Sequence, residues 1–453
     1  MSRENDELKK IIMTSLEDIL KEAGEGSTEP KRRKTNGDRP ARKRGTGAIV
    51  KNIEYKWYGD DEKKFYNNLE DSQKSFIADL EVRIKGLNKE EIPMRFKIMM
   101  SNIDDKIKAV AIKKLSYLYS MDESSGEFYK TSNWIEALCK LPIGRYRNLP
   151  VNSSSPVEDI RSFIKTTKQK LDDVVYGHTE AKDQLIRFLA QRISKSNAIG
   201  NNVIGLEGPP GVGKTLIAKA GISKALDLPF QFISLSGSED SSHMVGHSYT
   251  YEGSTWGKIA DMLMKSDVMN PVIFMDELDK VSGSHKGEEI TNLLIHLTDP
   301  TQNDKFQDKY FMDVDFDLSK CLIIFSYNDA NLINPILRDR MIKIKTDGYK
   351  LPDKIQIAQK YLLSDLCGQF SMDRENIVMT DETIKYLILN RLEEEKGVRN
   401  LKRGLELILS NINLNLILSE ENIPFPIKIT EDIVNKYVKL PENSFKKYQS
   451  MFL

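Results

Sequence analysis

The eight residues 208–215 have the clearest chemical pattern in the chain, because they fit G-x-x-x-x-G-K-[ST]. An apolar run at 203–206 precedes them, and residues 216–220 continue with helical periodicity. Glycines let backbone N–H groups turn toward phosphate oxygens, and a helix start adds partial positive charge. We therefore expect a phosphate-binding loop, which consists of Gly208, Pro209, Pro210, Gly211, Val212, Gly213, Lys214 and Thr215.

Two side chains of this loop have expected roles. Lys214 is placed to reach the β- and γ-phosphates of a nucleotide, and the Thr215 hydroxyl is placed to hold magnesium. The alternative is an ordinary Gly/Pro turn in front of a helix.

Polar side chains also end two further apolar runs. Residues 271–275 lead into Asp276 and Glu277, and residues 321–327 lead into Asn328. We expect Asp276 to contact the magnesium ion, Glu277 to polarise the attacking water, and the Asn328 amide to orient that water or contact the γ-phosphate. An acidic turn without chemistry is the alternative for the carboxylate pair.

Other candidates flank this core. Arg338 and Arg340 have no carboxylate partner at helical spacing, so they are either functional or ordinary surface salt-bridge residues. Tyr176 and Gly177 lie just ahead of a helix that precedes the phosphate loop. Such a segment commonly covers the base of a nucleotide, and a plain packing helix is the alternative.

Composition sets the limits on the function. The 453 residues exceed one ordinary core, so two to four domains are expected. Lys+Arg and Asp+Glu both number 67, which gives no reason for wholesale binding to nucleic acid or anionic membrane. Three isolated cysteines, a charged start and the lack of an apolar run of about twenty residues predict a soluble, intracellular protein without a membrane span.

The N-terminal part predicts two further regions. Residues 1–50 combine a short amphipathic helix at 8–20 with a disordered basic linker, and residues 51–155 form a helical domain. The clusters at 31–34 and 42–44 resemble a bipartite nuclear-import signal and would also suit phosphate contact with nucleic acid. A solvated charge run is the alternative, so the expected location is cytoplasmic, with the nucleus as an option.

Five motifs follow one another along the chain: the loop 208–215, Asp276–Glu277, Asn328, Arg340 and the Gly-Val-Arg sequence that ends in Arg399. In this order they resemble the Walker A, Walker B, sensor 1, arginine finger and sensor 2 motifs of an AAA+ ATPase. More narrowly, the chain resembles the ATPase module of Lon protease between about residues 171 and 438. The segments that carry this resemblance are 278–280, 297–303, 339–341 and 429–432.

The resemblance implies an α/β P-loop core with a parallel sheet at 156–350 and a C-terminal helical lid at 351–453. It also implies a homo-oligomeric ring, usually a hexamer, with ATP and Mg2+ as ligands. Arg340 would reach a neighbour's nucleotide, with Arg338 as a second candidate, while Arg399 would act from the lid of its own subunit.

Tyr251 resembles the aromatic pore-loop residue with which such rings grip polypeptide, and Trp256 is a second candidate for this role. A core tyrosine is the alternative. Only fifteen residues follow the matched region, so we expect a Lon-like motor that remodels or unfolds proteins without a peptidase domain. The rival interpretations are a nucleic-acid motor or loader acting in DNA replication, repair or packaging, and a nucleotide-gated scaffold. Glu277 argues against the scaffold, because a pure switch needs no water-activating carboxylate.

Overall fold

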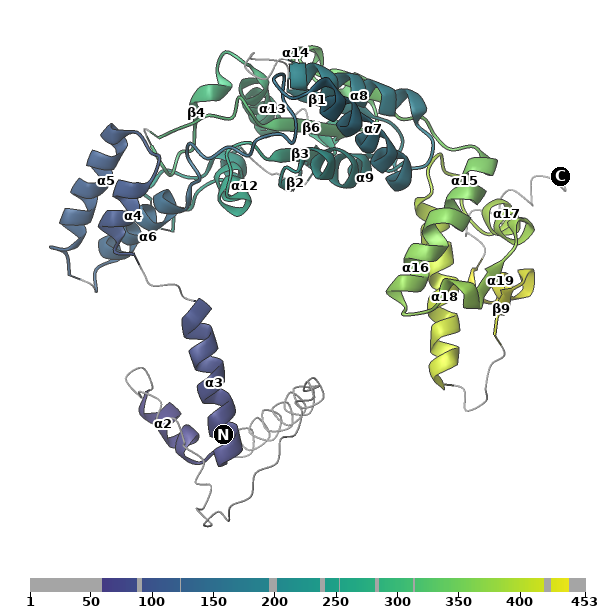
Figure 1. Cartoon of the computed structure of the whole chain (residues 1–453), viewed down its shortest axis with the longest axis horizontal. Helices are drawn as coiled ribbons and strands as arrows, with labels where there is room; N and C mark the ends of the chain where they lie inside the picture. Colours follow the sequence, from purple (N-terminus) through teal and green to yellow (C-terminus); the bar gives the residue numbers. More distant parts are fainter. Residues whose placement is uncertain are drawn as a thin grey trace, which may run out of the picture. The chain divides into compact units, whose positions relative to one another are not determined.

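The computed structural model describes residues 59–87, 92–122, 124–194, 202–236, 241–251, 253–281, 285–312, 314–418 and 425–439. The helix expected at 8–20 and the basic clusters at 31–34 and 42–44 lie outside these residues. The chain divides into two compact units, residues 1–91 and 92–453, and Figure 1 labels their elements. The first unit contains α2 (Asp60–Asn67) and α3 (Asp71–Leu87), which bury Tyr66, Leu69 and Ala78.

The second unit begins with three helices, α4 (Met94–Met100), α5 (Asp105–Leu118) and α6 (Gly126–Lys140). The side chain of Asp104 caps α5 by accepting from the Lys106 N–H, and that of Ser125 caps α6 by accepting from the Phe128 N–H. Their buried apolar residues belong to the same hydrophobic cluster as one face of the central sheet. The three helices therefore share a core with the α/β part of the chain.

A five-stranded parallel sheet forms the centre of this unit. Its strands are β1 (Val203–Glu207), β2 (Phe230–Ser234), β3 (Val272–Asp276), β6 (Leu322–Tyr327) and β7 (Ile342–Lys345), in the order β2-β3-β6-β1-β7. Because all strands are parallel, their carboxyl ends meet at one edge, and β1, β6 and β3 are direct neighbours there. This confirms the expected α/β fold class.

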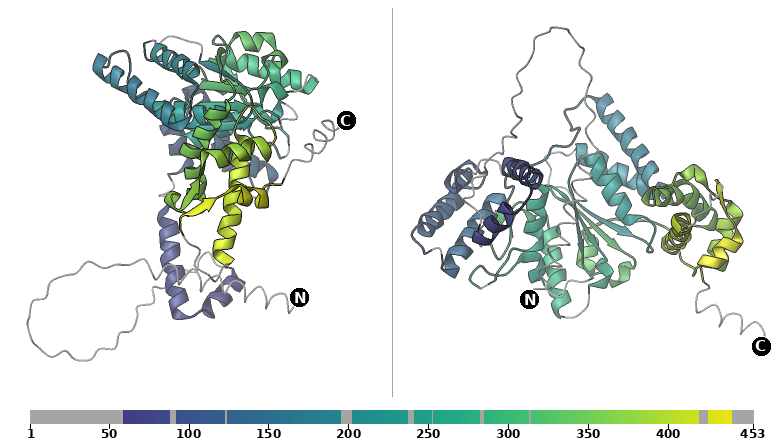
Figure 2. Two further views of the ribbon diagram at one scale, coloured as in Figure 1. Left: turned by 90° about the vertical axis from the view of Figure 1, so that its right-hand side faces the viewer. Right: turned by 90° about the horizontal axis from the view of Figure 1, so that it is seen from below.

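Helices cover both faces of the sheet (Figure 2). Alternate residues of β3 point to opposite faces, so Ile273 and Met275 join one buried cluster while Val272 and Phe274 join the other. The second cluster includes residues of α7 (Val157–Val174), α8 (Thr179–Ser194) and the helix after β1, which runs through α9 (Lys214–Leu216), a π-helical turn and α10 (Lys224–Leu226).

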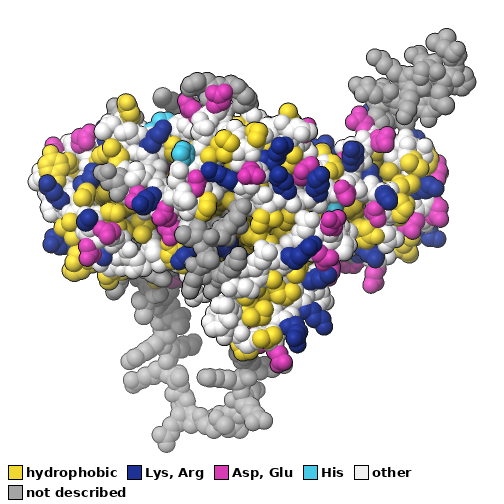
Figure 3. Space-filling view, turned by 90° about the horizontal axis from the view of Figure 1, so that it is seen from above, with side chains coloured by type: hydrophobic (Ala, Val, Ile, Leu, Met, Phe, Trp, Pro, Cys, Tyr) yellow, Lys and Arg dark blue, Asp and Glu magenta, His cyan; other side chains and the backbone are white. Residues whose placement is uncertain are grey.

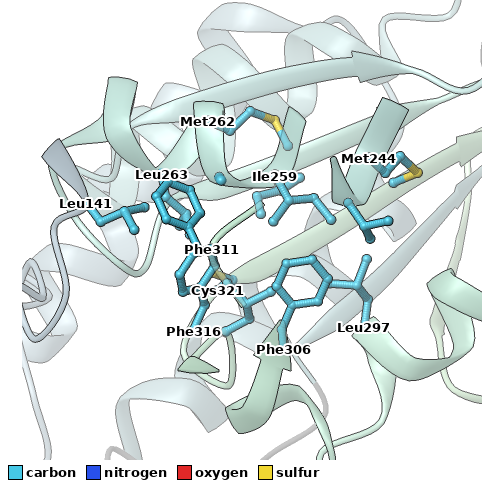
Figure 4. Close-up of a cluster of buried hydrophobic side chains, with 14 of the residues drawn as sticks. Leu141, Met244, Ile259, Met262, Leu263, Leu297, Phe306, Phe311, Phe316 and Cys321 are labelled. Carbon is cyan, nitrogen blue, oxygen red and sulfur yellow. The ribbon is translucent and has the colours of Figure 1, made fainter. Parts of the chain in front are cut away.

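The first cluster packs against α11 (Ser242–Val245), α12 (Lys258–Ser266) and α13 (His285–Thr298). Phe306 of β4 (Phe306–Gln307), Phe316 of β5 (Asp315–Phe316) and Phe311 belong to the same cluster (Figure 4). The short helix α14 (Pro335–Asp339) lies between β6 and β7 in the chain.

The C-terminal helices have a hydrophobic core of their own. They are α15 (Leu351–Ile357), α16 (Leu363–Gln369), α17 (Asp381–Asn390), α18 (Arg399–Leu418) and α19 (Glu431–Tyr437), with a parallel pair of strands, β8 (Ile377–Met379) and β9 (Ile427–Ile429). Leu363, Leu387 and Leu405 are completely buried there. The first of these helices begins at Leu351, where the lid was expected.

Charged side chains of both signs are interspersed over the face drawn in Figure 3. This matches the equal numbers of acidic and basic residues in the sequence. Among the helices that the structure describes, none is long and apolar enough to cross a bilayer.

Candidate functional site

The loop after β1 turns tightly between the strand and the following helix. Gly211 and Gly213 have φ angles of +78° and +92°, which favour glycine. Position 208 needs a glycine because there is no space for a side chain: a Cβ there would lie 2.2 Å from Thr346 Oγ1. The helix then begins at Lys214, so its N-terminus follows the loop directly.

Lys214 lies where the carboxyl ends of β1 and β6 meet. Its side chain is buried, and Nζ donates to the carbonyl oxygens of Gly208 and Tyr327 and, at 2.8 Å, to Oδ1 of Asn328. Burial lowers the pKa of Lys214, while the nearby carboxylates of Asp276, Asp279 and Glu277 oppose this shift. The sheet thus brings the predicted lysine and asparagine into direct contact.

Asp276 is the last residue of β3, and Glu277 follows in a left-handed conformation with φ of +60°. A residue other than glycine is rarely held in this region, and such strain costs about 1–3 kcal/mol and clusters at functional sites. The Glu277 N–H donates to Asp276 Oδ1 at 3.0 Å. The backbone therefore turns sharply between the two carboxylates.

These residues line one cavity of about 920 Å³. The α/β core contributes Tyr176, residues 210–215, Asp276, Glu277 and Asn328; Gly208 and Pro209 do not line it. The C-terminal helices contribute the opposite wall, with Lys360, Tyr361, Asp365, Arg399, Lys402, Arg403 and Glu406. Gly177 does not line this cavity but lines a neighbouring one of about 510 Å³, and Tyr176 lines both cavities.

The turn before α18 lies directly on the phosphate loop. The Val398 N–H donates to the Gly211 carbonyl oxygen at 3.1 Å. A Cβ on Gly397 would lie 2.2 Å from the Pro210 carbonyl oxygen, so the approach needs a glycine. This contact places Arg399, the first residue of α18, in the cavity wall.

Several lining residues were not predicted from the sequence. Tyr349, two residues before α15, has its hydroxyl within hydrogen-bond distance of the Val212 and Tyr176 carbonyl oxygens, at 3.0 and 3.3 Å. His178 Nε2 donates to the same Val212 oxygen at 3.1 Å. Burial raises the pKa of Tyr349 and lowers that of His178, so at neutral pH the phenol remains a donor and the imidazole is neutral.

Lys402, Arg403 and Glu406 follow Arg399 at spacings of three, four and seven residues, so they share one face of α18. That helical spacing of polar residues is the signal that could have found them. For Tyr349 the only available signal was an aromatic residue just ahead of the expected lid.

Asp276 and the Thr215 hydroxyl supply oxygen atoms, which are the ligands that Mg2+ prefers. Magnesium commonly binds one or two protein groups and completes its shell with phosphate oxygens and water. The residues present therefore fit this ion. Among the described residues, no group of three or more His, Cys, Asp or Glu side chains is arranged for a metal.

Arg340 does not line its own chain's cavity. It follows α14, where Nη2 pairs with Asp299 Oδ2 at 3.0 Å and Nη1 donates to the Ile295 carbonyl oxygen. The sequence showed no carboxylate partner at helical spacing, and the fold supplies one from the residue after α13. Arg338 Nη1 donates to the Ala330 carbonyl oxygen at 3.1 Å.

The loop between α11 and α12 carries the two aromatic candidates. The side chain of Tyr251 is 69% exposed, so it is not a core tyrosine. Trp256 is half-buried, and its ring packs edge-on against that of Tyr310 with centroids 5.8 Å apart. Tyr251 therefore projects from the loop, whereas Trp256 packs at its base.

The sequence is similar to proteins of a known family. Residues 204–347 match the family model described as "ATPase family associated with various cellular activities (AAA)". The chain is 38% identical to a Lon protease homolog of Acanthamoeba polyphaga mimivirus over 341 residues, which are 74% of this chain and 32% of that protein. It is 36% identical to a Lon protease of Cytophaga hutchinsonii, over 70% of this chain and 37% of the relative.

A mitochondrial Lon protease homolog of Yarrowia lipolytica is 34% identical over 73% of this chain and 27% of its own length. The chain thus spans about a third of the length of these three relatives. The matched region includes the sheet and the phosphate loop. The chain therefore contains an AAA ATPase module that resembles the ATPase module of Lon proteases.

Proposed function

We propose that the chain hydrolyses ATP in the cavity between the sheet edge and α18. The observation that carries this proposal is the convergence of Lys214, Asn328 and the Asp276–Glu277 pair at the ends of adjacent strands. Cations and helix-terminal N–H groups stabilise negative charge on phosphoryl oxygens, and a carboxylate activates water. Each of these groups lines the same cavity.

The residues at this site have different roles in hydrolysis. The backbone N–H groups of the phosphate loop and Lys214 hold the phosphates, and Arg399, with its neighbours on α18, adds positive charge from the lid. Glu277 takes a proton from the attacking water, which the Asn328 amide orients. Thr215 and Asp276 hold Mg2+, which neutralises charge on the phosphate oxygens when bound.

We further propose that the ATPase works as a homo-oligomeric ring, usually a hexamer, that unfolds polypeptide. The exposed Tyr251 supports this part, since an aromatic ring can press on any extended backbone without reading its sequence. The relatives carry the name Lon protease, and this name says that they act on proteins. We assign the grip on the polypeptide during unfolding to Tyr251.

A stimulation assay separates this function from the rival nucleic-acid motor. Unfolded casein is expected to raise the ATPase rate severalfold, whereas single- and double-stranded DNA are expected to leave it unchanged. A nucleic-acid motor would instead need a groove of clustered Lys and Arg that follows the phosphate backbone. Stimulation by DNA alone would favour the nucleic-acid motor.

Replacing Lys214 with Ala is expected to weaken ATP binding by about a hundredfold or more, because each charge-assisted hydrogen bond to phosphate is worth about 1.5–3 kcal/mol. Equilibrium binding of a fluorescent ATP analogue measures the loss. Lys219→Ala is the matched control, since Lys219 is an exposed lysine on the same helix. Unchanged affinity in Lys214→Ala would refute the phosphate-loop assignment.

Replacing Tyr251 with Ala is expected to abolish unfolding of a tagged test protein and to leave most of the ATP hydrolysis, because the tyrosine lies outside the nucleotide cavity. Tyr251→Phe should keep unfolding, since the ring is retained. Tyr129→Ala, at another exposed tyrosine, controls for surface effects. Fluorescence of the test protein reports unfolding, and equal unfolding by Tyr251→Ala and the parent would exclude the gripping role.

A further inference from the structure

Asp308 lies at the base of the loop that carries Tyr251. Its side chain is 1% exposed, and Oδ2 accepts a hydrogen bond from the Gly257 N–H at 2.8 Å. Oδ1 accepts from the Tyr310 N–H at 2.9 Å. Gly257 is the last residue before α12, whose Ile259 and Leu263 are completely buried in the core. One carboxylate therefore joins the segment after β4 to the end of the loop.

The two ends of the loop meet at this carboxylate. Gly246 has φ of +76°, and a Cβ on it would lie 2.8 Å from the Gly257 nitrogen and 2.9 Å from Asp308 Oδ1. The Lys309 N–H donates to the Val245 carbonyl oxygen at 2.8 Å, just ahead of the loop. The segment that contains Asp308 thus holds both the entry and the exit of the loop.

Rings pack around the same point. Tyr310 lies edge-on to Tyr249 and Trp256, with centroids 5.9 and 5.8 Å away. The Trp134 Nε1–H of α6 donates to the Tyr310 carbonyl oxygen at 3.2 Å. The base of the loop is therefore packed, whereas Tyr251 at its tip is exposed.

Backbone N–H groups surround the carboxylate of Asp308. Burial raises the pKa of Asp308 to about 6, and the N–H groups of Gly257, Tyr310 and Phe311 oppose the shift. Above that pH the side chain is a buried carboxylate at the start of α12, where the partial positive charge of the helix favours it. Hydrogen bonds to a charged group are roughly twice as strong as neutral ones.

We propose that Asp308 is a positioning residue for the loop that carries Tyr251. Its carboxylate fixes the base of this loop, so that force from the core reaches Tyr251. The proposal rests on the function proposed above for Tyr251. A loop that pulls must be anchored to rigid elements, and here the anchor joins α12 to the segment after β4. Within the loop, Ser254 Oγ donates to the carbonyl oxygens of Ser248 and Tyr251, and the Tyr249 hydroxyl lies 3.0 Å from Thr131 Oγ1 of α6.

The test compares Asp308→Asn and Asp308→Ala with a matched control, Asp315→Asn. Asn keeps one acceptor oxygen but presents an NH2 group to the other N–H, so it loses one of the two hydrogen bonds, and Ala loses both. Asp315 is an exposed aspartate on β5 that accepts from Gln307 Nε2 at 2.7 Å, and Asn can retain that bond. Oligomer size and thermal unfolding are measured for each variant.

The first measurement needs no polypeptide substrate. Chymotrypsin cleavage after Tyr249 and Tyr251, quantified by mass spectrometry, is expected to accelerate about tenfold in Asp308→Asn and further in Asp308→Ala, because a charge-assisted hydrogen bond at the base is lost. Asp315→Asn should match the parent. Equal cleavage rates in all four proteins would overturn the positioning role, and Asp308→Asn decides the result where Asp308→Ala does not fold.

The second measurement is the unfolding of a tagged test protein per ATP hydrolysed. We expect this ratio to fall about tenfold in Asp308→Asn, with kcat and KM for basal ATP hydrolysis changed less than the ratio. A faster cleavage with an unchanged ratio would overturn the claim that the anchor transmits force, provided that Tyr251→Ala abolishes unfolding. If Tyr251→Ala itself unfolds normally, the proposed function fails instead, so the two failures are distinguishable.

Discussion

Replacing Glu277 with Gln is expected to lower the turnover of ATP by about a hundredfold to ten-thousandfold while ATP binding is retained. General-base catalysis typically contributes about this much, and the amide cannot take the proton from water. Gln has nearly the same shape as Glu, so the left-handed turn after β3 has no new steric demand. Single-turnover hydrolysis and equilibrium binding of ATP together separate the chemical step from affinity.

The matched control is Glu406→Gln, which makes the same chemical change on the α18 wall of the same cavity. Its turnover should stay close to that of the parent, because the lid helix is not the source of the water-activating carboxylate in this assignment. Hydrolysis at a near-normal rate by Glu277→Gln would mean that another group activates the water. A parallel loss of ATP affinity would instead indicate a role in binding.

The sequence predicted those parts of the site that are local in the chain. In a parallel sheet the strand ends share one edge, so residues that follow β1, β3 and β6 were expected at the same edge, and the observed strand order makes these three strands neighbours. The hydrogen bond between Lys214 and Asn328 joins residues 114 positions apart, and it is possible because β1 and β6 are neighbours in the sheet. The lid was expected from a family resemblance rather than from spacing.

The remaining contacts depend on tertiary packing that no local pattern encodes. Arg340 finds its carboxylate in Asp299, 41 residues earlier, because α13 ends beside α14. Tyr349 reaches the phosphate loop because the chain passes the Val212 carbonyl on its way into α15. Trp256 packs on Tyr310, which is distant in sequence, so its burial could not be read from the loop itself.

Arg340→Ala is expected to lower ATP turnover by about a thousandfold or more, the usual contribution of an arginine that stabilises the transferred phosphoryl group from a neighbouring subunit. Arg340 lies outside its own chain's cavity, so a direct contact with the transferred phosphoryl group would have to be made across an interface. The substitution also removes the contacts to Asp299 and Ile295, so thermal unfolding and oligomer size must be measured alongside the ATPase rate.

Mixing identifies the subunit on which Arg340 acts. An Arg340→Ala subunit keeps an intact phosphate loop, whereas a Lys214→Ala subunit keeps the arginine, so one kind of mixed interface combines both. Because ring interfaces are head-to-tail, about a quarter of the interfaces in a random equimolar ring have this combination. Equimolar mixing should therefore raise the rate well above that of either variant alone, and Arg338→Ala mixed in the same way is the control. Rings that gain no activity on mixing would exclude a trans-acting Arg340, and rescue limited to Arg338→Ala would assign the finger to that neighbouring arginine.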